Sequence, residues 1–252
     1  MTAFPVAQLS DKARRVIRCY GVWGTFVLCV GHCKTLARRY PGMRFDRRYG
    51  VDTEARMFPH ELNIDGPALA DEHSYEPTPP NAFHEIIRLL PIQPADFVFV
   101  DFGCGKGRTL LLAAEAGFRE IIGVELSPVT SNVATNNIAI FSKIFPGKSR
   151  ICVKTGDAKD FEIPNTPCVL YFYNPFPASI MAHVLSKIEK SYAEWPRYMV
   201  LIFYNLGEST YARLTQSFTR VAQRQQNWRR SGFVILEAHP PDQGRRTPDQ
   251  PR

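Results

Sequence analysis

The sequence predicts an α/β fold, in which a mostly parallel sheet carries helices on both faces and is closed by an antiparallel strand. From about residue 80, short apolar runs typical of buried strands alternate with stretches that have apolar residues at helical spacing. Such alternation is typical of a parallel sheet. An acidic or amide residue also follows each of the first four runs, which places polar side chains at one edge of that sheet.

The expected elements follow in chain order. Helices are expected over residues 83–90, 109–117, 129–145 and 178–193, and strands over 97–102, 120–126, 151–157, 168–175 and 198–205. Pro91 ends the first helix and Gly117 the second. Residues 217–227 and 232–239 have the pattern of a closing antiparallel pair. Residues 41–80, rich in Pro, Asp, Glu and His, are interpreted as an irregular approach to this domain.

Charge and polar composition divide the chain into three parts. Residues 1–50 carry ten Lys and Arg against two acidic residues, whereas the remaining 202 residues carry 21 against 22. The net charge of +7 therefore belongs to a basic N-terminal extension, residues 1–50, and not to the domain expected over residues 51–240. The polar residues 241–252 are expected to be a disordered tail.

The extension contains a short apolar segment, residues 20–31, between two basic clusters. It is shorter than the ~20 apolar residues that a membrane-spanning helix needs. Two interpretations remain. The segment docks on the domain as a helix, or residues 12–39 contact an anionic membrane surface peripherally.

The six cysteines contain no C-x-x-C pair, and Cys29, His32 and Cys33 lack a fourth neighbouring ligand for zinc. No metal is therefore expected, and reduced thiols favour a cytoplasmic protein, with membrane association possible through the extension. The sequence predicts no oligomeric state.

The sequence DFGCGKGR, residues 101–108, is the richest motif of the chain. The phosphate loop of nucleotide hydrolases needs a different spacing, and the dinucleotide fingerprint needs glycine where Arg108 stands. Glycines at 103, 105 and 107 let the backbone turn sharply and approach a ligand closely. Because Asp101 precedes them, the ligand is expected to carry positive charge, which favours S-adenosylmethionine over a pyrophosphate.

Three further polar residues stand at the next three strand ends. Glu125 follows the second strand, where an acid can accept hydrogen bonds from both ribose hydroxyls. Asp157 follows the third strand and can accept from an adenine amino group, and Asn174 follows the fourth and faces the reactive centre. Each could instead simply begin a loop, but all four strand ends together favour a nucleoside site.

Through the motifs VDFGCGKGR, GVELSP and TGDAKDF, the chain resembles class I S-adenosylmethionine-dependent methyltransferases over about residues 80–205. The segments FDRRYGVDT, SYEPTP, DFGCGKGRTLLLAAE, GVELSP and LYFYNPF together resemble a widespread bacterial group whose substrates are mostly unassigned. The resemblance implies a Rossmann-like, seven-stranded methyltransferase sheet and S-adenosylmethionine as the cofactor.

The resemblance also implies roles for single residues. Tyr75 and Thr78 resemble a segment that folds over the methyl donor in related lysine methyltransferases, although a Pro-rich turn before a helix explains them equally well. The remaining cofactor-binding roles are Asp101 at the methionine amino end, Gly103, Gly105 and Gly107 along the donor, Glu125 at the ribose and Asp157 at the adenine.

The segment NPF, residues 174–176, resembles the N-P-P-[YF] motif of amino-group methyltransferases. It implies that Asn174 orients the acceptor as the catalytic residue, with Tyr173 and Phe176 as substrate-binding walls. Phe176 stands where the motif has its second proline, and Pro177 where it has its aromatic residue, so a stacked nucleobase is not implied.

The sequence therefore predicts a methyltransferase that acts on an amino or hydroxyl group of a protein side chain or small molecule. Two alternatives stay open. A nucleic-acid methyltransferase is disfavoured by the near-neutral domain, although the basic extension could supply phosphate contacts. A non-catalytic domain that binds the methyl donor at a membrane surface is the other.

Overall fold

The computed structural model describes residues 41–55, 57, 75–147, 149–173, 178–204, 219–224 and 232–240. Within these ranges the chain forms a seven-stranded sheet in the order β3-β2-β1-β4-β5-β7-β6. The apolar segment 20–31 and the tail 241–252 lie outside the described residues.

Strands and helices alternate as the sequence predicts. The helices are α2 (Pro80–Arg88), α3 (Arg108–Glu115), α4 (Pro128–Ile144) and α5 (Ala178–Glu194), with a short 3-10 turn, η4 (Pro94–Asp96), before the first strand. The strands are β1 (Val98–Phe102), β2 (Glu120–Glu125), β3 (Arg150–Thr155), β4 (Cys168–Tyr173), β5 (Met199–Tyr204), β6 (Thr219–Arg224) and β7 (Phe233–Ala238).

The pairing of the strands confirms the predicted sheet. β1 pairs in parallel with β2 and β4, and the same direction continues outward to β3 and β5. β7 then pairs antiparallel with β5, and β6 pairs antiparallel with β7, with a register shift between Arg220 and Ala222. The expected closing antiparallel pair is therefore present.

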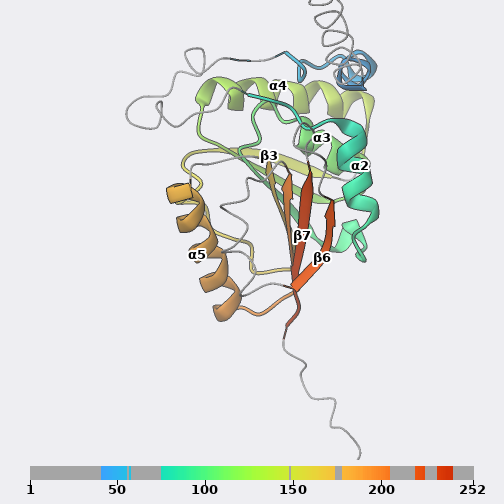
Figure 1. The fold of residues 1–252 in the computed structure, drawn as a ribbon. Helices are drawn as coiled ribbons and strands as arrows, with labels where there is room; N and C mark the ends of the chain where they lie inside the picture. The colour runs from blue at the N-terminus through green and yellow to red at the C-terminus, as the bar shows by residue number, and fades with distance from the viewer. Residues whose placement is uncertain are drawn as a thin grey trace, which may run out of the picture.

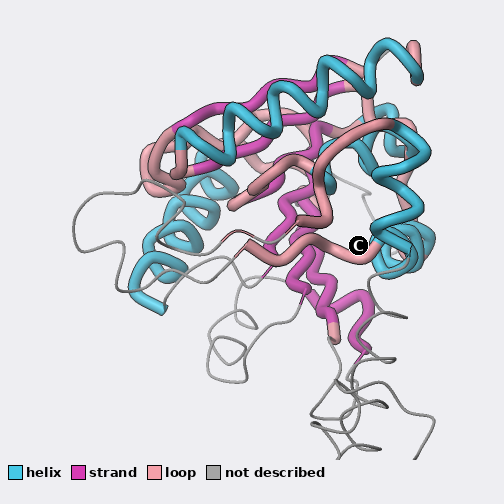
Figure 2. Tube along the Cα trace, turned by 90° about the horizontal axis from the view of Figure 1, so that it is seen from above, coloured by secondary structure: helices cyan, strands magenta, loops and turns pink. Residues whose placement is uncertain are grey.

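Two hydrophobic cores cover the two faces of the sheet, because successive strand residues point to opposite sides. Phe99 and Tyr171 face the core that α2, α3 and α4 cover, whereas Val100 and Phe172 face the core under α5. Figure 1 shows α5 against one face and α2 and α3 against the other, and Figure 2 shows the helices on both sides of the strands from above.

Residues 41–49 are helical, which corrects the interpretation of residues 41–80 as irregular throughout. Phe45 and Tyr49 lie one turn apart on this helix and are buried in the core beside α3 and α4. The Tyr49 hydroxyl donates to Glu115 at the end of α3. None of the helices in the described part of the chain combines the length and hydropathy that crossing a bilayer requires.

Candidate methyl-donor site

The predicted site lies where β1 separates two halves of the sheet. β1 has β2 on one side and β4 on the other, so the order of strands reverses next to it. Ligands of open α/β sheets bind outside the carboxyl ends of the strands at such a reversal. Asp101 lies in β1 at this end, in register with Gly123 of β2 and Tyr171 of β4.

The glycine loop has the tight geometry that its sequence predicts. The backbone φ angles of Gly103, Gly105 and Gly107 are +79°, +52° and +82°, values that residues with a Cβ rarely adopt. The amides of Gly103 and Cys104 both donate to the carbonyl oxygen of Val124, at 2.8 and 3.1 Å. This anchors the loop to β2, and α3 begins directly after Gly107. The N-terminal end of α3 therefore lies at the end of the loop.

Asp101 is buried at 2% exposure on the face that α3 covers. Burial raises the pKa of its carboxyl from 3.8 to about 8, the Thr109 hydrogen bond lowers this pKa, and the Glu125 charge raises it. A carboxyl in this environment is stabilised as an anion when a positive charge comes close. The site therefore suits a cationic ligand group.

Glu125, the predicted ribose ligand, contacts the glycine loop. One of its carboxylate oxygens accepts from the Gly105 amide at 2.7 Å, and the other accepts from the Ser127 amide at 2.9 Å. Burial raises the pKa of this carboxyl, and the hydrogen bonds from Ser127 and Gly105 lower it. Hydrogen bonds from the Thr130 side chain and the Leu126 amide lower this pKa as well, so the carboxylate is held by several groups around the loop. Glu125 thus shapes the loop, a role that the sequence analysis missed.

Asp157 lies in the turn after β3. Its oxygens contact the Lys159 amide at 2.9 Å and the Lys159 ammonium at 3.0 Å. These are the bonds of an aspartate that begins a turn. An adenine contact at Asp157 stays a prediction.

Tyr75 and Thr78 are held by different parts of the molecule. The Tyr75 ring lies so close to Gly105 that a Cβ there would collide with ring atoms Cδ2 and Cε2. Thr78 lies deeper, where its hydroxyl pairs with the Tyr171 hydroxyl at 3.0 Å and accepts from Thr109 at 3.5 Å. Tyr75 therefore covers the glycine loop, while Thr78 contacts the residues around Asp101.

The Thr78 and Tyr171 hydroxyls form a buried pair, so removing one of them should destabilise the fold. Thr78→Val is expected to lower the free energy of unfolding by about 1–3 kcal/mol, because the Tyr171 hydroxyl loses its partner. Chemical denaturation measures this loss. Adding Tyr171→Phe removes the second hydroxyl as well and should recover part of the stability; a double variant that is less stable by the sum of both changes contradicts the pairing.

The carboxyl ends of β4 and β5 carry two aromatic residues. Tyr173 and Tyr204 pack edge to face with ring centroids 4.9 Å apart. Tyr204 was not predicted, although it ends a strand in the same way as Tyr173. Asn174 and Phe176 lie outside the described residues, so their roles stay predictions.

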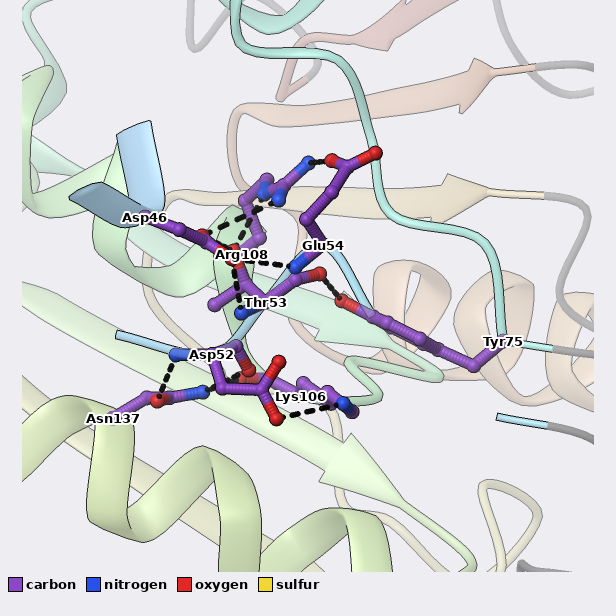
Figure 3. Close-up of polar contacts among 8 residues, drawn as sticks. All are labelled: Asp46, Asp52, Thr53, Glu54, Tyr75, Lys106, Arg108 and Asn137. Atoms are coloured by element: carbon purple, nitrogen blue, oxygen red, sulfur yellow. Dashed lines mark hydrogen bonds and ion pairs between the residues drawn. The ribbon is translucent and has the colours of Figure 1, made fainter. Parts of the chain in front are cut away.

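A buried polar cluster that was not predicted from the sequence lies beside the glycine loop (Figure 3). Arg108, which excluded the dinucleotide fingerprint, is 2% exposed and contacts residues that precede it by more than 50 positions. The sequence does contain one indication of this cluster, because Arg108 is a charged residue at the start of an otherwise apolar helix. The partners of that arginine could not be identified from spacing.

Several solved structures are similar to this chain. One is the protein described as "Putative methyltransferase yhhF" from Escherichia coli, with TM-score 0.53 and 13% identity over 66% of this chain and 88% of that chain. Magnesium protoporphyrin IX methyltransferase (ChlM) from Synechocystis PCC 6803, solved with bound SAM, gives TM-score 0.48 and 14% identity over 81% and 96% of the two chains. An RNA methyltransferase from Salinibacter ruber, solved with S-adenosyl-L-homocysteine, gives TM-score 0.46 and 18% identity. The match covers 69% of this chain and 100% of that chain.

The sequence comparisons give the family directly. No curated protein sequence matches the chain. Residues 76–233, more than half of the chain, match the protein family described as methyltransferase domain. The methyltransferase assignment made from the sequence motifs is confirmed, and the chain belongs to this methyltransferase family.

Proposed function

We propose that this methyltransferase transfers a methyl group from S-adenosylmethionine to an amino or hydroxyl group of a protein side chain or small molecule. Asp101 carries the methyl-donor part of the proposal, because it is a buried acid at the end of β1 beside three glycines with positive φ. A site for a pyrophosphate would place an anion against this acid, whereas a sulfonium amino acid brings positive charge to it.

Four groups would hold the methyl donor. The Asp101 carboxylate would bind the amino end, and the glycine backbone would allow close approach. Glu125 would accept from the ribose hydroxyls, and Asp157 would accept from the adenine amino group. When bound, S-adenosylmethionine supplies a methyl group on a sulfonium that is already activated for attack by a nucleophile. The chain then mainly needs to align the acceptor, which is catalysis by proximity.

The acceptor would bind beyond the ends of β4 and β5. Tyr173 packs on the buried Tyr204 there and would form an aromatic wall, and Asn174 follows Tyr173 directly in the sequence. An amide oxygen at Asn174 can accept a hydrogen bond from an N–H or O–H of the acceptor and so orient its lone pair. Phe176 would complete the wall.

One observation favours a nucleic-acid acceptor as a second candidate. The ten Lys and Arg within residues 1–50 could contact phosphates. The rest of the chain, with 21 basic against 22 acidic residues, lacks the positive charge that a nucleic-acid-binding domain normally carries. We therefore favour a protein or small-molecule acceptor.

Thermal unfolding with S-adenosylmethionine, NAD or ATP tests the methyl donor. We expect S-adenosylmethionine alone to raise the melting temperature, because a ligand that binds only the folded state stabilises it. No increase contradicts the proposal. Incubation of the protein and labelled methyl donor with separated protein, RNA and small-molecule fractions then identifies the acceptor. Label in the RNA fraction overturns our preference, and no label in any fraction favours a non-catalytic binding domain.

Asn174→Ala tests the acceptor side separately from the methyl-donor side. We expect turnover to fall about a hundredfold, since the acceptor loses its orienting hydrogen bond, while the dissociation constant for S-adenosylmethionine stays nearly unchanged. Single-turnover kinetics and calorimetric titration measure the two quantities. A large loss of methyl-donor affinity with normal turnover at saturation would move Asn174 to the cofactor site.

A further inference from the structure

Residues 46–54 form a compact segment, here called the strap, that lies beside the glycine loop (Figure 3). Asp46 organises it, because its carboxylate accepts from the amides of Thr53 and Glu54 at 2.8 and 2.7 Å and from the Thr53 hydroxyl. Thr53 is fully buried. The two ends of the strap are therefore held together by one side chain.

Arg108 joins the strap to the first residue of α3. Its Nε donates to the Thr53 hydroxyl at 2.7 Å, and the two terminal nitrogens reach Glu54 at 2.8 Å and Asp46 at 3.4 Å. The guanidinium is buried, and its whole donor fork points at the strap. Gly42 makes room for this contact, since a Cβ there would collide with Glu54 and Arg108.

A second attachment fixes the strap to the middle of the glycine loop. The Lys106 ammonium contacts the Asp52 carboxylate at 3.0 Å. Asn137 of α4 donates to the carbonyl oxygens of both Asp52 and Lys106 at 2.9 Å, and its own oxygen accepts from the Asp52 amide. The strap and the loop therefore share hydrogen bonds with the same helix.

The strap in turn holds Tyr75. The Thr53 carbonyl oxygen accepts from the Tyr75 hydroxyl at 2.8 Å, and the Tyr75 ring lies over Gly105. The Lys106 ammonium lies 5.9 Å from the centre of this ring. Thr53 thus connects Arg108, through its hydroxyl, with Tyr75, through its carbonyl. Strap and Tyr75 both precede residue 76, where the match to the family begins.

We propose that Arg108 is a positioning residue for the methyl-donor site: it fixes Thr53 and thereby holds Tyr75 over the glycine loop, without touching the methyl donor itself. This role for Arg108 rests on the proposed function, because it presumes that S-adenosylmethionine binds at the glycine loop. All three nitrogens of the guanidinium are directed at the strap, so Arg108 acts through the position of Tyr75.

A purely structural role for Arg108 predicts a different result. A buried ion pair that only holds the fold together lowers stability when it is removed, with no specific effect on a ligand. Arg197 offers a matched control, because it is also a buried arginine and donates to Ser191, in the last turn of α5, and to Trp195, directly after this helix. Arg197→Lys should lower the melting temperature alone.

Calorimetric titration with S-adenosylmethionine tests the coupling in four proteins: wild type, Arg108→Lys, Tyr75→Phe and the double variant. We expect the dissociation constant to rise about tenfold in Arg108→Lys and about threefold in Tyr75→Phe. Both changes break the same connection from Arg108 through Thr53 to Tyr75. The double variant should therefore bind S-adenosylmethionine no more weakly than Arg108→Lys does. Additive effects, or an Arg108→Lys variant that behaves like Arg197→Lys, overturn the proposal.

Hydrogen exchange of the ligand-free proteins gives a second measurement that needs no methyl donor. The Tyr75 amide donates to Met57, and we expect it to exchange faster in Arg108→Lys but not in Arg197→Lys. Thr53→Val serves if Arg108→Lys fails to fold, since it removes the hydroxyl that Arg108 contacts and keeps the carbonyl that Tyr75 uses. Unchanged exchange in these variants overturns the proposal. A wild type that does not bind S-adenosylmethionine, with exchange altered as expected, contradicts the proposed function instead.

Discussion

Replacing Gly105 by alanine is expected to raise the dissociation constant for S-adenosylmethionine by about tenfold or more. Gly105 has φ of +52°, and a residue with a Cβ pays about 1–2 kcal/mol in this left-handed region. The added Cβ would also collide with the Tyr75 ring, so the ring or the loop must move. Both movements would change the surface at which we propose that the methyl donor binds. Calorimetric titration measures the change.

Gly117→Ala is the matched control for this variant. Gly117 also has a positive φ, +96°, but a Cβ there meets nothing within 4 Å. Strain alone should therefore lower the melting temperature of Gly117→Ala and leave methyl-donor affinity as it is. If Gly105→Ala behaves in the same way, the glycine at 105 serves only the backbone conformation.

Asp101→Asn should weaken methyl-donor binding more than any other single change, by about thirtyfold to a hundredfold. In the proposed site the Asp101 carboxylate would stabilise the amino end of the methyl donor with a negative charge that the amide cannot supply, and charged hydrogen bonds contribute about 1.5–3 kcal/mol. The amide has nearly the same shape as the carboxyl, so the fold around Thr109 should persist. Titration calorimetry measures the loss, and unchanged affinity contradicts the assignment.

The pH dependence of the same variant separates charge from general damage. Burial raises the pKa of Asp101 from 3.8 to about 8, so the ligand-free folded protein keeps a proton that the unfolded chain releases near pH 4. The stability of the ligand-free wild type should therefore fall as pH rises from about 4 to about 8, relative to Asp101→Asn. Methyl-donor affinity should rise towards about pH 8, because a bound cation favours the carboxylate. Parallel pH profiles of the two proteins contradict this mechanism.

The sheet and the position of the site could be predicted because both follow from local patterns. The central strands β1, β4 and β5 are apolar runs of five or six residues, and the polar residue at or after the end of such a run is adjacent in sequence. Once the strands are parallel, these ends meet at one edge without any knowledge of packing. Asp101 and Glu125 were found in this way, and both lie at that edge.

The contacts of the site could not be predicted because they join distant parts of the chain. Arg108 and Thr53 are 55 positions apart, and Thr78 and Tyr171 are 93 apart. Nothing in the spacing of such residues indicates that they touch. The helix over residues 41–49 was missed for a related reason, since its charged residues conceal the apolar pair Phe45 and Tyr49 that packs on the core.

The two outer strands of the sheet, β3 and β6, have features that disfavour aggregation. A sheet edge presents unpaired amides and carbonyls that a second chain can extend into a larger sheet. β3, at one edge, exposes Arg150 and Lys154, and charged side chains on an edge strand disfavour such pairing. β6, at the other edge, carries the register shift between Arg220 and Ala222, which interrupts the regular ladder. Each edge thus has its own barrier to sheet extension by another molecule.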